Sequence, residues 1–155
     1  MKTIICGFSG IGKSTVAKNQ SNVLDFESSV FSHKLNGEID IDFPDNYVDE
    51  LMKVMSDEKY DYYLVSCHKS VRDELKRRGL DYIIVLPTKS QRNEYLKRWL
   101  KRGSLMSFIK SMNRRWEYLI QSCEEDDAVK IYLNNNEYLS DILYSKDILY
   151  LRKEY

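Results

Sequence analysis

Short apolar runs alternate along the chain with segments whose apolar residues have helical spacing. Five runs rich in β-branched and aromatic residues predict buried strands, at residues 2–6, 22–26, 60–67, 81–86 and 128–133. Apolar residues three or four positions apart predict helices, at residues 13–20, 47–56, 69–78 and from residue 137 onward. Residues 28–46, which contain Gly37 and Pro44, predict a short helix and a mobile loop. This alternation predicts an α/β fold in three layers, with a parallel sheet between helices.

The region before the last predicted strand is helical and basic. Thr88-x-x-Gln91 predicts a capping box at the start of a long helix, which Gly103 interrupts before a second helix runs to about residue 123. Residues 88–116 hold nine Lys and Arg against one acid, Glu94, a net charge of +8 in a chain of zero formal charge. Such a segment favours a bound polyanion, and a solvated helical face is the alternative.

Length and composition narrow the class of protein. The chain has 155 residues, which predicts a single domain over residues 1–155. Its three cysteines are widely spaced and form no C-x-x-C pair, so we expect reduced thiols and a cytoplasmic protein. The apolar stretch near the start is too short for a signal peptide or a membrane span, so no membrane partner is expected.

The first predicted strand leads into the sequence GFSGIGKS, residues 7–14, which has the spacing of a phosphate-binding loop. Glycines let successive N–H groups turn inward around an anion, and the following helix adds the positive end of its dipole. Lys13 can reach the β- and γ-phosphates of ATP, and the Ser14 hydroxyl can coordinate Mg²⁺. The predicted ATP-binding residues here are Gly7, Ser9, Gly10, Ile11, Gly12, Lys13, Ser14 and Thr15.

With this loop, its small size and its arginine-rich region, the chain resembles the P-loop kinases of small substrates. These include nucleoside-monophosphate, shikimate and dephospho-coenzyme A kinases. The segments FPDNY, YLVSCHKSVRDEL and YLKRWLKRG are similar to nucleotide kinases of the phage type. The resemblance implies a P-loop NTPase fold with strand order 2-3-1-4-5, a LID over about residues 88–122, and the cytoplasm of a phage host as a location.

One feature departs from many P-loop proteins, which end the third strand with an acid that holds Mg²⁺ through water. Here that strand ends in Ser66-Cys67-His68, and Asp61 lies at its other end. Magnesium would therefore depend on Ser14 and on Asp25 or Glu27.

Asp25 and Glu27 follow the second predicted strand. In the similar kinases that phosphorylate hydroxyl groups, a pair of acids stands at this place, and one orients and deprotonates the hydroxyl. A phosphate acceptor is already an anion, whereas a hydroxyl benefits from a base. Asp25 is therefore the predicted base and Glu27 a predicted acceptor ligand; the alternative is that both only cap a helix or hold Mg²⁺.

The resemblance also suggests roles for residues farther along. Arg72 is a candidate to bind an acceptor phosphate, with a surface position as the alternative, and His68 is a candidate acceptor ligand or a structural residue. Arg98 and Arg102 are the predicted catalytic LID arginines, and Arg92 a predicted substrate ligand. Two of five arginines are expected to contact phosphate, namely Arg92, Arg98, Arg102, Arg114 and Arg115. Asn135 is a candidate adenine contact, or part of a turn; Trp99 and Trp116 are expected in the core.

These observations favour a Mg-ATP-dependent kinase acting on a hydroxyl of a nucleotide-type acceptor, which includes 5-hydroxymethyluracil in DNA. A nucleoside-monophosphate kinase is the first alternative. The second, of another class, is a regulatory module that binds ATP and has no acceptor.

Overall fold

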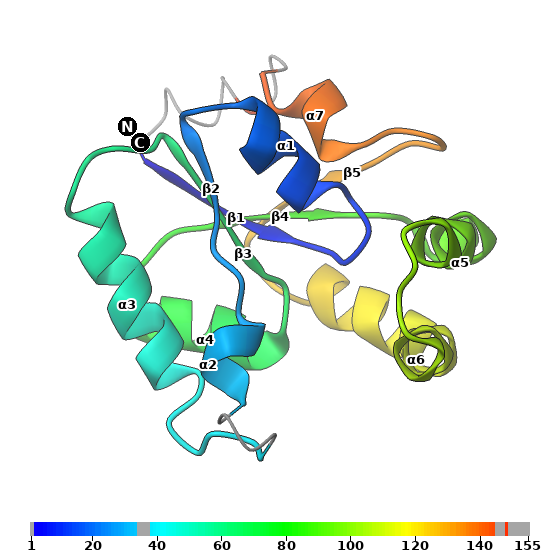
Figure 1. Ribbon diagram of the computed structural model, residues 1–155, viewed down its shortest axis with the longest axis horizontal. Helices are drawn as coiled ribbons and strands as arrows, with labels where there is room; N and C mark the ends of the chain where they lie inside the picture. Colours follow the sequence, from blue (N-terminus) through cyan, green and yellow to red (C-terminus); the bar gives the residue numbers. More distant parts are fainter. Residues whose placement is uncertain (1, 34–37, 145–147, 149–155) are drawn as a thin grey trace.

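A five-stranded parallel sheet, in the order β2-β3-β1-β4-β5, forms the centre of the computed structural model (Figure 1). The structure describes residues 2–33, 38–144 and 148. The strands are β1 (Thr3–Gly7), β2 (Val23–Asp25), β3 (Tyr62–Ser66), β4 (Ile83–Leu86) and β5 (Val129–Tyr132). Parallel strands need crossover connections, and helices supply them here. The predicted α/β class and the strand order expected from the resemblance are both confirmed.

Helices cover both faces of the sheet. Those of the first half are α1 (Lys13–Asn19), α2 (Ser29–Ser32), α3 (Asp45–Met55) and α4 (Lys69–Arg77). Those of the second half are α5 (Arg92–Lys101), α6 (Met106–Glu124) and α7 (Leu139–Ile142), with a 3₁₀ turn at Lys89–Gln91. Helices α1 and α7 lie on one face and α3 and α4 on the other, while α5 and α6 pack together near β4 (Figure 1).

The predicted capping box is confirmed. The Thr88 N–H donates to Gln91 Oε1 over 2.7 Å, and Gly103, at φ 78°, lies in the turn between α5 and α6. A helix was predicted from residue 137 onward. Up to residue 144 the structure has the four-residue helix α7, Leu139–Ile142, in that region. Residues 34–37 of the predicted loop, and most of the tail beyond residue 144, lie outside the described residues.

Aromatic side chains fill the core between the glycine-rich loop and the two helices near β4. Phe8, Tyr95, Trp99 and Trp116 are buried, and their rings meet edge-on or tilted at centroid distances of 5.5–6.2 Å. Such pairs add about 0.5–1.5 kcal/mol each beyond the burial of their area. The expectation that both tryptophans belong to the core is confirmed, and the cluster fixes α5 against the loop.

Within the described residues, no helix combines the length and the apolar character that a membrane crossing requires.

Candidate functional site

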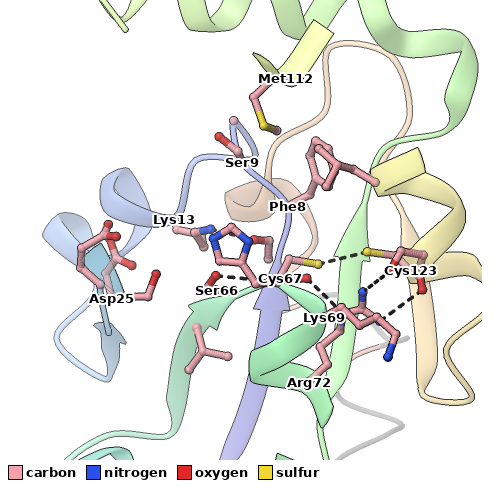
Figure 2. A pocket seen from close by; sticks show the side chains of 18 of the residues that line it. Phe8, Ser9, Lys13, Asp25, Ser66, Cys67, Lys69, Arg72, Met112 and Cys123 are labelled. Carbon is pink, nitrogen blue, oxygen red and sulfur yellow. Dashed lines mark hydrogen bonds between the residues drawn. The ribbon is translucent and has the colours of Figure 1, made fainter. Parts of the chain in front are cut away.

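A cavity of about 420 Å³ opens where the carboxyl ends of the strands meet (Figure 2). The glycine-rich loop lines one side, the ends of β2 and β3 form its floor, and one face of α6 forms the opposite wall. Ligands of open parallel sheets bind at this edge. Of the predicted residues in the loop, six line the cavity: Gly7, Ser9, Gly10, Gly12, Lys13 and Ser14.

The loop needs glycine at two positions because of its backbone. Gly10 and Gly12 both have φ 92°, in the left-handed region that other residues rarely adopt. Gly12 is also crowded, since a Cβ there would lie 3.2 Å from the Tyr138 ring. The backbone therefore wraps tightly just before α1 begins at Lys13.

Lys13 lies inside this wrap. Its Nζ donates to the Gly7 carbonyl oxygen over 2.7 Å. Burial lowers the pKa of Lys13, while the nearby Cys67, Asp25 and Glu27 oppose that shift. A half-buried ammonium group that lines the cavity is well placed to receive an anion that enters it.

Two acids at the end of β2 face the same cavity. Asp25 is the last residue of the strand and Glu27 follows it; both line the cavity. Burial raises the pKa of Asp25, Lys13 opposes this, and Glu27 adds to it. A carboxylate with a raised pKa is a better proton acceptor than an ordinary one.

Tyr47 of α3 holds the ends of β2 and β3 together beneath these acids. Its hydroxyl donates to the Phe26 carbonyl over 2.5 Å and accepts from the Ser66 N–H over 3.3 Å. Tyr47 is fully buried and its ring stacks on Phe26 at 4.9 Å. The floor of the cavity is thus fixed by a residue that does not line it.

The end of β3 carries no acid, as the sequence indicates. Ser66, Cys67 and His68 occupy it, and all three line the cavity. Burial and the cations Lys13 and Arg115 lower the pKa of His68, while Glu27 opposes this shift. The imidazole therefore offers a hydrogen-bonding group to the cavity.

The described residues contain no group of three His, Cys, Asp or Glu side chains arranged to hold a metal ion. Ser14 and Asp25 nevertheless line the same cavity and offer oxygen ligands. This set suits Mg²⁺, which commonly binds one or two protein oxygens and completes its shell with water and substrate phosphates. The residues present therefore fit that ion better than zinc, which takes four protein ligands in structural sites.

Arg72 does not lie on the surface, which was the alternative to its predicted role. It borders the cavity but is 2% exposed, and its guanidinium is held within the protein. It donates to Asp126 over 2.7 Å, to the Cys67 carbonyl over 3.0 Å, and to the Ser122 hydroxyl over 2.7 Å. This geometry supports a structural role and does not favour the predicted binding of an acceptor phosphate.

Arg98 also lies elsewhere than the LID hypothesis places it. It is 9% exposed and does not line the cavity. Its guanidinium donates to the Gly10 carbonyl over 3.0 Å and to the Glu137 carbonyl over 2.7 Å, between the rings of Tyr95 and Tyr138 at 4.4 and 3.8 Å. Arg98 therefore stabilises the glycine-rich loop from outside the cavity.

The other arginines divide between the cavity and the surface. Arg102 and Arg115 line the cavity, and Arg102 Nη2 donates to Ser9 Oγ over 3.2 Å. Arg92 does not line the cavity, and its Nη2 lies 3.6 Å from Glu117 Oε1. The structure therefore does not bring Arg92 to the site. Arg114 is exposed and is likewise absent from the cavity lining.

Three predicted nucleotide ligands also lie outside the cavity lining. Ile11 is fully buried, Thr15 is exposed on α1, and Asn135 is exposed in the loop after β5. The segment that follows this loop contacts the glycine-rich loop directly, because the Leu139 N–H donates to the Ile11 carbonyl over 2.9 Å.

The wall that α6 provides was not among the predicted parts of the site. Phe108, Met112 and Leu119 line the cavity together with Arg115. Their spacing of three and four residues places them on one face of a helix. This pattern is visible in the sequence, but it is also what a core-facing helix shows.

Comparison with known proteins yields neither a matching family model nor a significantly similar curated protein.

Proposed function

We propose that the chain is a Mg-ATP-dependent phosphotransferase that moves the γ-phosphate to a hydroxyl group of a nucleotide-type acceptor. The observation that carries the proposal is the meeting of Lys13 and Asp25 in one cavity, each close enough to influence the other's pKa. A phosphate-binding cation and a carboxylate of raised pKa are the two groups that transfer to a hydroxyl requires.

The donor phosphates would bind the glycine-rich loop as a P-loop. Its sequence spacing, its position between β1 and α1, and the left-handed Gly10 and Gly12 support this assignment. Lys13 would hold the β- and γ-phosphates and Ser14 would hold Mg²⁺, with Asp25 as a metal ligand in the alternative in which it does not act as the base. The metal, when bound, neutralises charge that develops on the phosphate oxygens.

The acceptor would occupy the space between the acids and α6. Asp25 would orient the hydroxyl and accept its proton, while Glu27 and His68 would contact the acceptor. Arg102 and Arg115, which face the same space, would stabilise the negative charge of the transferring group. Apolar side chains of α6 form a surface against which a base or another flat group can pack.

Two observations bear on the acceptor. Arg72 forms a buried ion pair with Asp126, so its guanidinium is less able to bind the phosphate of a monophosphate acceptor. The basic segment presents seven exposed cations, which favours an acceptor within DNA: Lys89, Lys97, Lys101, Arg102, Lys110, Arg114 and Arg115. A free nucleoside remains compatible with a chain of zero net charge.

A transfer assay with radiolabelled ATP and Mg²⁺ tests the proposal. The acceptors are nucleosides, nucleoside monophosphates, plain DNA and DNA containing 5-hydroxymethyluracil, and Lys13→Ala is the matched control. Label in a hydroxyl acceptor supports the proposal, and a steep loss of rate with salt identifies DNA. Label only in a monophosphate contradicts the role of Asp25. ATP binding without any transfer favours the regulatory module.

A further inference from the structure

Two thiols meet in the wall of the cavity where the sheet and α6 come together. Cys67 follows β3 and Cys123 lies in the last turn of α6, and their Sγ atoms are 3.3 Å apart (Figure 2). Both residues line the cavity; Cys67 is partly exposed there, whereas Cys123 is 2% exposed. The third cysteine, Cys6, is fully buried inside β1 and does not line it.

Arg72 fixes the two chain segments that carry these thiols. Its Nε donates to the Cys67 carbonyl, and its Nη1 and Nη2 donate to the carbonyl and hydroxyl oxygens of Ser122, at 2.7–3.2 Å. Asp126 in turn holds the guanidinium in place. One buried ion pair therefore fixes the backbone segments that carry the two thiols.

The environment of the pair also divides the proton between the two sulfurs. The hydrogen bond between the two thiols lowers the pKa of Cys123, against burial and with the help of Arg72. The same hydrogen bond, together with burial, raises the pKa of Cys67. Cys123 is thus the thiol of the pair that ionises more readily, and the thiolate is the reactive form of cysteine.

We propose that Cys67 and Cys123 are an oxidation site, at which a peroxide converts the two thiols into a reversible intramolecular disulfide. A disulfide bond is about 2.05 Å long, so the sulfurs must approach by little more than 1 Å. In reducing compartments such bonds are transient and serve redox sensing, which is consistent with a pair that rests in the thiol state.

The chemistry balances with hydrogen peroxide as the oxidant. The Cys123 thiolate attacks one peroxide oxygen, the O–O bond breaks, and the departing hydroxide takes up a proton to leave as water. Cys123 is then a sulfenic acid. Cys67 attacks its sulfur as the S–O bond breaks, and the Cys67 proton leaves with the hydroxyl as a second water. Two thiols and one peroxide give one disulfide and two water molecules.

The bond would join the end of β3 to α6 beside the acceptor space. His68 is the next residue after Cys67, and the face of α6 that holds Cys123 forms the opposite wall. We expect the oxidised protein to transfer phosphate more slowly while it still binds ATP at the glycine-rich loop. This consequence rests on the proposed function; the formation of the bond does not.

Thiol counting and peptide mapping after treatment of the reduced full chain with hydrogen peroxide test the proposal. Free thiols in the denatured protein should fall from three to one, and the mass should fall by two hydrogens. Mapping should find a Cys67–Cys123 peptide that dithiothreitol separates. Cys6→Ala should retain the cross-link, whereas Cys67→Ser and Cys123→Ser should lose it.

Three results would overturn the proposal: persistent thiols, a bond between molecules, or a bond that includes Cys6. For the consequence, wild type and Cys67→Ser are compared in the transfer assay before and after peroxide. Equal loss of transfer in both would show that the bond does not act on the acceptor space. If neither protein transfers phosphate in any state, the proposed function fails while the thiol count still decides the disulfide.

Discussion

The two sides of the cavity are built in different ways. Helix α5 packs against the glycine-rich loop. Arg98 donates to the Gly10 carbonyl and Trp99 donates to the Ser9 hydroxyl. The rings of Tyr95 and Trp99 pack against each other. On the acceptor side, Asp25 and His68 direct ionisable groups into the cavity, with pKa values shifted by burial and by Lys13. On the loop side, the side chains of α5 are occupied by contacts within the protein, whereas on the acceptor side Asp25 and His68 line the cavity.

This difference shows why a local motif does not describe a site. The loop sequence specifies its own backbone, but side chains about ninety positions away hold it, such as Trp99 on Ser9. Five substitutions test the contrast.

Asp25→Asn should have the largest effect. Loss of a general base costs about 10²–10⁴-fold in rate, and ATP binding should change little. Because burial raises the pKa of Asp25, the wild-type rate should rise with pH along an acid limb whose midpoint lies above the ordinary value of about 3.9. The variant should lack this limb. Rates between about pH 4 and 8 check it; recovery of the variant by added Mg²⁺ would mean that Asp25 serves only as a metal ligand.

Asp126→Asn tests the buried pair that anchors α4 to α6. Removing one partner of such a pair costs about 3–5 kcal/mol of the free energy of unfolding, since Arg72 would remain charged and unpaired. Hydrogen bonds from the Ala128 N–H, Arg72, Tyr82 and Lys76 hold the pKa of Asp126 well below its usual range, although burial opposes this shift.

The stability that Asp126 contributes is therefore present above its unfolded pKa of about 3.9, and is lost as the pH falls through its lower folded value. Urea unfolding at several pH values measures this dependence. Asp127→Asn is the matched control, because that exposed neighbour pairs only at the surface with Lys76 and should cost at most about 1 kcal/mol. Equal losses in the two variants would contradict the structural role.

Arg102→Ala and Arg98→Met compare two arginines one helical turn apart. Arg102 faces the cavity, so its loss should lower the rate about 10²–10³-fold and change stability by less than about 0.5 kcal/mol. Arg98 is buried against Gly10, so its loss should cost about 1–3 kcal/mol of stability, because carbonyl groups lose their donor. Thermal unfolding and transfer rates distinguish the two, and the opposite pattern would restore the LID role of Arg98.

Ser9→Ala should have the smallest effect. The Ser9 hydroxyl accepts from Trp99 Nε1 and from Arg102 Nη2, both over 3.2 Å. Loss of one such acceptor costs about 0.5–1.5 kcal/mol. ATP affinity measured by calorimetry should weaken by a corresponding factor, with Ser140→Ala, an exposed position on α7, as the control. An unchanged affinity would show that α5 does not support the loop through this hydroxyl.

The sequence predicted the sheet, its helices and the glycine-rich loop because each depends on local patterns. Apolar runs ending in Gly7 or followed by Pro87 mark strands without reference to the rest of the chain. It could not predict which arginines reach the cavity. Arg98 and Arg102 share a helix face in the sequence, yet one bonds to Gly10 and the other lines the cavity. That outcome depends on where α5 packs, which no spacing reveals.

Arg72 teaches the same lesson from the other side of the sheet. Its place after a strand resembled a ligand position, but Asp126, fifty-four residues later, occupies its guanidinium.

The contacts of Arg98 also bear on the order in which the molecule is completed. Arg98 joins the Gly10 carbonyl to the Glu137 carbonyl, and the Ile11 carbonyl accepts from Leu139. The glycine-rich loop is therefore completed by residues that are made more than one hundred and twenty positions later. A nascent chain that stops after β4 carries the whole motif but lacks these partners, so nucleotide binding should arise late in synthesis, together with β5 and the loop that follows it.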